Sequence, residues 1–208
     1  MATWAKVHNM RALLHIGEEV AFHSATAIAA IDRTTQAPDA PDVWVDLYAL
    51  AAHAACAGAF LNASLSRRDD VKVEFPGRKP AFRLYTGVTE DLDSIKLVRD
   101  VMIHADERFE AEWMRLESLG QETTLLRMRA VGRLPSSCAT LINWDPNQMT
   151  ISGRVGMSNN QRDVKYSSVG LTELRKQLTN LQVGSARFEE EVGRMFPPRP
   201  GPTDPSDG

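Results

Sequence analysis

Apolar residues recur at helical spacing over three long stretches of the chain, which predicts a helical bundle. The first stretch covers residues 5–34 and ends before a segment bounded by Pro38 and Pro41, which stops a helix. The second, residues 42–65, is rich in alanine and allows a neighbouring helix to approach closely. The third, residues 170–196, carries a stripe with steps of three and four residues, as in a bundle helix. That stripe consists of Leu171, Leu174, Leu178, Leu181, Ser185, Phe188, Val192 and Met195.

A fourth helical stretch lies in the middle of the chain. It begins near Thr89, where a run of hydroxyl and acidic side chains suits a helix N-terminus. Its apolar positions, Leu92, Ile95, Val98 and Met102, are predicted to face the core. The pattern then continues, or re-forms after a break, as far as Gly120.

Two segments have a different pattern that favours strands and loops. Residues 134–166 contain the β-like runs Cys138–Asn143 and Gln148–Ser152 on either side of an Asp-Pro-Asn sequence, which predicts a hairpin. Residues 66–88 contain two prolines and a Pro-Gly pair, and are expected to be a connecting loop. A small hairpin within that loop would pair Val71–Phe75 with Phe82–Tyr85.

These elements predict a mainly α fold, a four- to five-helix bundle with a small β-hairpin insertion before the last helix. A chain of 208 residues with 43% hydrophobic content can bury one substantial core, so residues 1–196 are expected to form a single domain. Residues 197–208 are rich in proline and polar residues and are expected to be disordered.

The net charge, the first residues and the most apolar run indicate where the protein is located and what it binds. The net charge of −3 gives no overall basic field that would attract nucleic acid or an anionic membrane. The first residues lack the basic stretch and apolar core of a signal peptide. The most apolar run is interrupted by Asp46 and His53, so it is interpreted as a buried helix rather than a membrane span. We expect a cytoplasmic protein without a membrane partner.

No residue pattern points to a metal or another cofactor. Cys56 and Cys138 are far apart and lack the paired spacing of zinc ligands or of a disulfide framework. His8, His15 and His23 recur at seven and eight residues along the first helix, which is too spread out for one ion. We expect these histidines to be structural.

The segment Arg99–Arg108 contains the strongest candidate chemistry. An arginine and a histidine close in space can bind a phosphodiester and move its proton. Arg99 and His104 lie about 140° apart on an ideal helix, so they would not share a face. Asp100 is one turn before His104 and can orient its imidazole. One phosphate would then be reached by both residues most easily at the interface of a homodimer, which we expect.

This segment resembles the Arg-x4–6-His motif of the HEPN superfamily of helical bundles. Arg99 and His104 have the Arg-x4-His spacing, with Asp100 after the arginine, and His-Ala-Asp-Glu-Arg108 is similar to a continuation in some bacterial members. The resemblance implies that two motifs meet across a homodimer and cleave RNA without a metal, in a toxin or defence setting. Arg99 would bind the phosphate, and His104 would act on the ribose 2′-hydroxyl or the leaving group. Arg108 is a further candidate for binding substrate.

The competing interpretation is a solvated helix face with local ion pairs, in a catalytically inactive module that dimerises or docks onto a protein partner. Residues 86–122 contain ten acids against four Lys or Arg, which would repel RNA. Basic residues gather later in the chain and would offer a groove if the hairpin placed them over the motif. They are Arg127, Arg129, Arg133, Arg154, Arg162, Lys165, Arg175 and Lys176.

Overall fold

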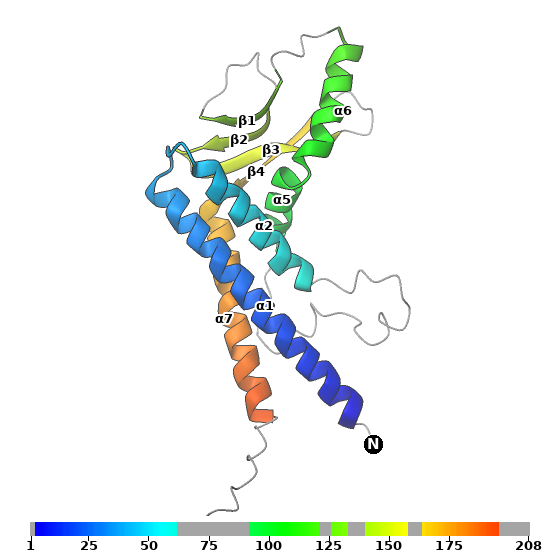
Figure 1. Cartoon of the computed structure of the whole chain (residues 1–208), viewed down its shortest axis with the longest axis vertical. Coiled ribbons are helices and arrows are strands. Elements are labelled where there is room, and N and C mark those ends of the chain that lie inside the picture. Colours follow the sequence, from blue (N-terminus) through cyan, green and yellow to red (C-terminus); the bar gives the residue numbers. More distant parts are fainter. Residues whose placement is uncertain (1–2, 62–91, 121–125, 133–139, 158–163, 196–208) are drawn as a thin grey trace, which may run out of the picture.

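The computed structural model describes residues 3–61, 92–120, 126–132, 140–157 and 164–195 (Figure 1). In this part of the chain there are five helices and four strands. The helices are α1 (Thr3–Gln36), α2 (Val43–Leu61), α5 (Asp93–Met102), α6 (Ala105–Ser118) and α7 (Leu171–Met195). The strands are β1 (Arg127–Val131), β2 (Thr140–Asp145), β3 (Thr150–Met157) and β4 (Val164–Gly170). The mainly α architecture with a β insertion before the last helix is confirmed.

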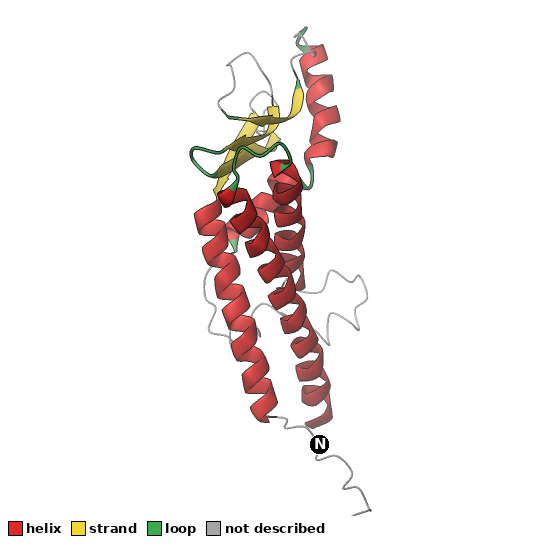
Figure 2. Cartoon of the chain, turned by 60° about the vertical axis from the view of Figure 1, so that its left-hand side comes forward, coloured by secondary structure: helices red, strands yellow, loops and turns green. Residues whose placement is uncertain are grey.

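The long helices α1, α2 and α7 form the body of the molecule, and the sheet lies at one end of it (Figure 2). Helix α1 contacts both α2 and α7, while α5 contacts α2 and α7. Leu47 and Leu50 of α2 and Leu178 and Leu181 of α7 are fully buried in this core. The predicted stripe on the last helix is buried from Leu171 through Val192, so the alternating spacing identified its inner face correctly.

Helix α2 is the only described helix that is long and apolar enough to cross a membrane. In this structure it packs between α1 and α5. Its buried positions follow one helical face: Val43, Leu47, Leu50, Ala51, Ala54, Ala57 and Leu61. Alanine and glycine on α2 allow close approach, since a Cβ built on Gly58 would lie 3.0 Å from Cγ2 of Ile95.

The central helical stretch is broken at Ile103 and His104, where α5 ends and α6 begins. His104 has φ −98° and ψ 22°, outside the helical values, and precedes the first residue of α6. We call Ile103–His104 the elbow. Helix α6 ends at Ser118, and two residues later Gly120 has a φ of 63°, which glycine readily adopts. Arg99 and His104 therefore do not lie on one continuous helix, and the expected separation of 140° around a single axis does not apply.

The β insertion is a four-stranded sheet in the order β1-β2-β3-β4, so the prediction of a hairpin alone was wrong. The predicted hairpin is its centre, where β2 and β3 pair in antiparallel register. Strand β1 pairs with β2 in parallel and β4 pairs with β3 antiparallel. Both edge strands are polar: exposed Arg127 and Arg129 alternate with Met128 in β1, and Lys165 to Ser168 dominate β4. The expected hydrophobic signal for a strand is weak in such segments.

The turn between β2 and β3 contains the predicted Asp-Pro-Asn sequence. Oδ1 of Asp145 accepts hydrogen bonds from the backbone N–H groups of Asn147 and Gln148, at 3.0 and 3.2 Å. Such side-chain bonding makes aspartate favourable at the start of a turn. The carbonyl of Met149 then accepts a bond of 2.9 Å from the N–H of Leu171, which joins this turn to the start of α7.

Helix α5 lies directly against the sheet. A Cβ on Gly153 of β3 would come within 2.5 Å of the Leu141 carbonyl oxygen and 2.7 Å of Cγ1 of Val101. The absence of a side chain at Gly153 thus allows α5 to approach the strand backbone. The sheet, together with α2, fixes the position of α5, the helix that carries Arg99. The predicted loop and hairpin in residues 66–88, Thr89, and the tail 197–208 lie outside the described residues.

Candidate functional site

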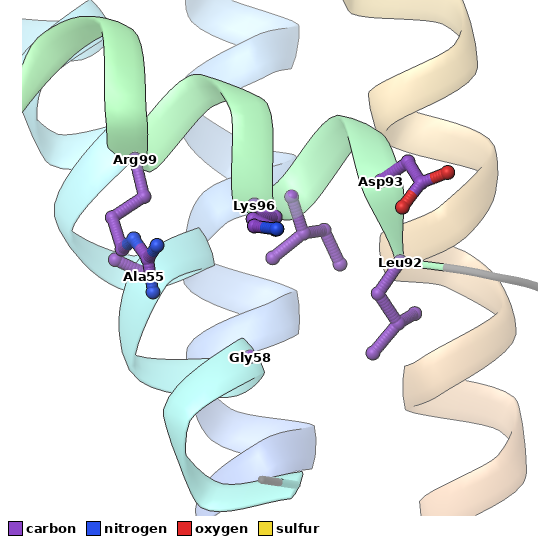
Figure 3. A pocket seen from close by; sticks show the side chains of 7 residues that line it. Ala55, Gly58, Leu92, Asp93, Lys96 and Arg99 are labelled. Atoms are coloured by element: carbon purple, nitrogen blue, oxygen red, sulfur yellow. The ribbon is translucent and has the colours of Figure 1, made fainter. Parts of the chain in front are cut away.

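A pocket of about 340 Å³ opens between α2 and α5 (Figure 3). We call it the α2–α5 pocket; it is lined by Ala55, Gly58, Leu92, Asp93, Ile95, Lys96 and Arg99. On the α2 wall, Ala55 presents only a methyl group, and Gly58 allows Ile95 of α5 to come close. The α5 wall contributes two cations, Lys96 and Arg99, which are three residues apart and so face the same way, and one carboxylate, Asp93.

Arg99 points toward α2 beside Ala55 (Figure 3). Its Nε and Nη2 donate to Oδ1 of Asp100, at 2.9 and 2.5 Å. The side chain remains 37% exposed, and within the described part of the chain Nη1 has no hydrogen-bond partner. Lys96 likewise has no ion pair with any described residue. Both cations therefore have N–H donors available to an anionic ligand in the pocket.

His104 lies at the elbow, beyond the last residue of α5, and its side chain is half-buried. Its imidazole does not cap α6, although histidine stands at the N-cap position. The structure therefore places the two motif residues on consecutive elements, with Arg99 in the α2–α5 pocket and His104 just past the helix that carries it. Asp100, predicted to orient the imidazole, is a hydrogen-bond partner of Arg99.

Arg108 connects three elements at the elbow. Its Nη1 donates to the backbone carbonyl of Asp100, and to the carbonyl of Arg154 at 2.6 Å. These bonds tie the end of α5 and the start of α6 to β3. Because this nitrogen is used on backbone carbonyls, the geometry supports a structural role for Arg108 in fixing the elbow, in contrast to the predicted contact with substrate.

A buried charge cluster lies between α6 and the sheet, and sequence reasoning missed it. Glu112 and Arg154 form an ion pair in which each side chain is only 3% exposed. Arg115 donates from Nε and Nη2 to the two carboxylate oxygens of Glu112, at 2.8 and 2.7 Å. Burial and the nearby Glu112 raise the pKa of Tyr166, which pairs with Arg154 across β3 and β4. The i,i+3 spacing of Glu112 and Arg115 was the only local signal of this cluster.

The predicted basic groove is only partly present. Arg154 is inside the protein, and Arg175 is paired with Asp32 at 2.8 Å on the surface. Arg127 and Arg129 of β1 are exposed. Arg133 and Arg162 lie outside the described residues. Of these later basic residues, the exposed arginines Arg127 and Arg129 belong to β1, which contacts α6.

Two histidines face each other between α1 and α2. Nδ1 of His23 lies 2.8 Å from Nδ1 of His53, and Nε2 of His23 is 3.6 Å from a carboxylate oxygen of Glu19. A hydrogen bond of this kind needs one protonated and one unprotonated Nδ1. Burial and the neighbouring His23 lower the pKa of His53. His23 and His53 are thus partners of each other across α1 and α2, while the side chain of His8 is not among those described.

The His23–His53 pair predicts that stability falls in mild acid. Because the folded-state pKa of His53 lies below its ordinary 6.5, the unfolded chain takes up the proton first as pH drops. The contribution is present above about pH 6.5 and is lost as pH falls through the folded-state pKa. Thermal melts between about pH 8 and pH 5 should show this loss, and His53→Gln should show less of it. Equal losses in His53→Gln and in the exposed-site control His15→Gln would contradict the assignment.

No protein-family model matches the chain, and comparison with curated proteins and with solved structures finds no match.

Proposed function

We propose that this is a HEPN-like, RNA-binding protein in which the α2–α5 pocket holds a backbone phosphate. The observation that supports this most strongly is the pair of cations, Lys96 and Arg99, lining one concave site. Arginine suits phosphate because its planar guanidinium presents several N–H donors in a fixed geometry. Lysine adds a mobile point charge beside it.

Asp100 sets a condition on this binding. It holds one edge of the Arg99 guanidinium, which positions the side chain before any ligand arrives. It also offsets part of the arginine charge, so a phosphate must approach through Nη1 and the Lys96 ammonium. We therefore expect modest affinity per site, with strong dependence on salt concentration.

RNA cleavage is the reaction that the motif would support. His104 would transfer a proton at the ribose 2′-hydroxyl or at the leaving oxygen, while Arg99 stabilises the phosphate charge. No step in this chemistry requires a metal. Arg99 and His104 lie on consecutive elements of one chain, and a homodimer with the two elbows facing each other would supply each site with the partner's histidine.

A second candidate function is a catalytically inactive module that docks onto a protein. Helix α6 and its C-cap residue present apolar side chains to solvent: Trp113 and Met114 on the helix, with Met114 69% exposed, and Leu119 at the cap. Exposed apolar groups gathered on one helix are typical of contact surfaces. This candidate predicts that purified protein neither binds nor cleaves RNA.

Incubation of purified protein with mixed RNA, with and without EDTA, tests the proposal. We expect cleavage that persists in EDTA and is lost in both Arg99→Ala and His104→Ala. Arg175→Ala is a matched control, because Arg175 is also an ion-paired arginine, 46% exposed, but lies away from the pocket on α7. Binding without cleavage would support the RNA-binding part alone. Absence of both would favour the docking module.

A further inference from the structure

A second pocket lies beside the elbow. It has a volume of about 350 Å³ and is lined by Tyr48, Met102, Ile103, Ala105, Met128 and Arg129. We call it the elbow pocket. Two of its lining residues, Ile103 and Ala105, are the chain neighbours of His104. The pocket is thus adjacent in the chain to the residue proposed to transfer the proton.

Two aromatic rings and one guanidinium group lie together at this pocket. The guanidinium carbon of Arg129 lies 5.7 Å from the ring centroid of Trp44 and 5.8 Å from that of Tyr48. The two rings are 6.3 Å apart and inclined at 45°. Arg129 comes from β1 and both rings come from the first turns of α2, so the fold brings together residues more than 80 positions apart.

We propose that the elbow pocket binds a nucleobase of single-stranded RNA, stacked on Arg129 and Tyr48. This inference rests on the proposed function, since it adds a base-binding subsite to the phosphate site at Lys96 and Arg99. Aromatic rings and arginine planes are the groups on which unpaired bases stack in proteins that bind single strands. The apolar wall made by Met102, Ile103 and Met128 covers the remaining faces of a planar base.

The proposal places one RNA strand in both pockets. Arg99 lies on α5 and Ile103 is the C-cap residue of that helix, four positions later, while Tyr48 and Ala55 are seven apart and lie on one face of α2. Tyr48 and Ala55 are separated by about 10 Å along the helix axis. A strand with its phosphate at Arg99 and a base at Tyr48 would pass along the α2–α5 contact toward the elbow. Its sugar would then approach His104, which stands between Ile103 and Ala105.

Base stacking is separated from phosphate binding by comparing two probes. The first is a fluorescently labelled oligoadenylate RNA, and the second is the same ribose–phosphate chain without bases. We expect the protein to bind the first probe more tightly. Arg129→Ala and Tyr48→Ala should weaken binding of oligoadenylate about tenfold and leave binding of the abasic chain nearly unchanged. Arg99→Ala should weaken both.

Conservative variants show whether the ring and the guanidinium plane are responsible. Arg129→Lys keeps the charge but loses the planar surface, so it should lose the preference for the base-bearing probe. Tyr48→Phe keeps the ring and should bind like the unmodified protein. Circular dichroism melts establish that each variant is folded.

Three outcomes would overturn the inference, and they differ in whether the proposed phosphate site is retained. Equal binding of the two probes, with no effect of Arg129→Ala but a loss in Arg99→Ala, would remove the base subsite and retain the phosphate site. Equal effects of Arg129→Ala on both probes would make Arg129 a phosphate contact. Failure of the unmodified protein to bind either probe would remove the base subsite and the proposed function together.

Discussion

Replacing Glu112 with leucine is expected to destabilise the protein by roughly 3–5 kcal/mol, as when one partner of a buried ion pair is removed. The change leaves the Arg154 guanidinium with no carboxylate in a position that is 3% exposed. Nε of Arg154 already lacks a hydrogen-bond partner among the described residues, so losing Glu112 would leave still more of the buried guanidinium without hydrogen bonds. Arg115 is less affected, since it is 20% exposed and can turn toward water. Urea unfolding followed by circular dichroism measures the loss.

The double variant Glu112→Leu/Arg154→Met is the control for this result. It removes both charges and fills the space with apolar groups, so it should recover most of the lost stability. A loss of less than about 1 kcal/mol in Glu112→Leu would show that the pair is not buried as described. Failure of the double variant to recover would mean that the side chains contribute through packing rather than through charge.

Val98→Asp should be comparably severe, with a loss of roughly 4 kcal/mol or more in the free energy of unfolding. Val98 is fully buried where α5 enters the core, so the new carboxylate would have no water around it. Its neighbour Arg99 borders the pocket, and Arg99→Ala should cost less than about 1 kcal/mol, as exposed substitutions usually do. His104→Ala is expected to behave like Arg99→Ala. Thermal melts of the three variants compare their losses of stability, and so distinguish residues needed for folding from residues proposed to act at the site.

A different order of stability losses among these three variants would change the interpretation of the elbow. If His104→Ala destabilised the protein as much as Val98→Asp does, His104 would be a packing residue and could not be the proton-transfer group. If Val98→Asp were well tolerated, α5 would not be held in the core, and the α2–α5 pocket would lose its rigid wall.

The helices could be predicted from the sequence because each buries a stripe with a clear period. The inner face of α7 followed from its leucines, and Val98 and Met102 were correctly placed in the core. The break at the elbow was harder to locate, because neither proline nor glycine, the residues that usually interrupt a helix, occurs at positions 103 and 104. The sequence allowed the helix either to continue or to re-form there, and only tertiary packing decides between these.

The extent of the sheet could not be predicted, because its edge strands depend on partners rather than on their own hydrophobicity. Strand β1 alternates exposed arginines with half-buried residues. It joins the sheet through parallel pairing with β2. Parallel pairing joins segments that are distant in sequence, so no turn signal announces it. For the same reason the sequence placed Arg154 and Arg129 together in one basic group. The fold buries Arg154 beside Glu112 and stacks Arg129 over Trp44 and Tyr48.

The sequence motif pointed to candidate residues, while their arrangement in space depends on the fold. Arg99 was identified from the motif, and the structure places it at a pocket. Lys96 was identified only as a nearby charge, because the pocket that it lines forms when α5 packs against α2. Arg108 was named as a candidate for binding substrate, which stays a prediction; its bonds to the carbonyls of Asp100 and Arg154 depend on the folding of α6 against β3.

The dependence of RNA affinity on salt concentration shows whether Arg99 and Lys96 form a phosphate site. Fluorescence anisotropy with a single-stranded RNA should show tight binding at low salt that weakens as salt rises. Arg99→Ala should lower the affinity about tenfold and reduce the slope of log affinity against log salt by about one, as for loss of one phosphate contact. Arg175→Ala, the matched surface arginine, should change neither. An Arg99→Ala variant with the affinity and salt slope of the unmodified protein would contradict the account.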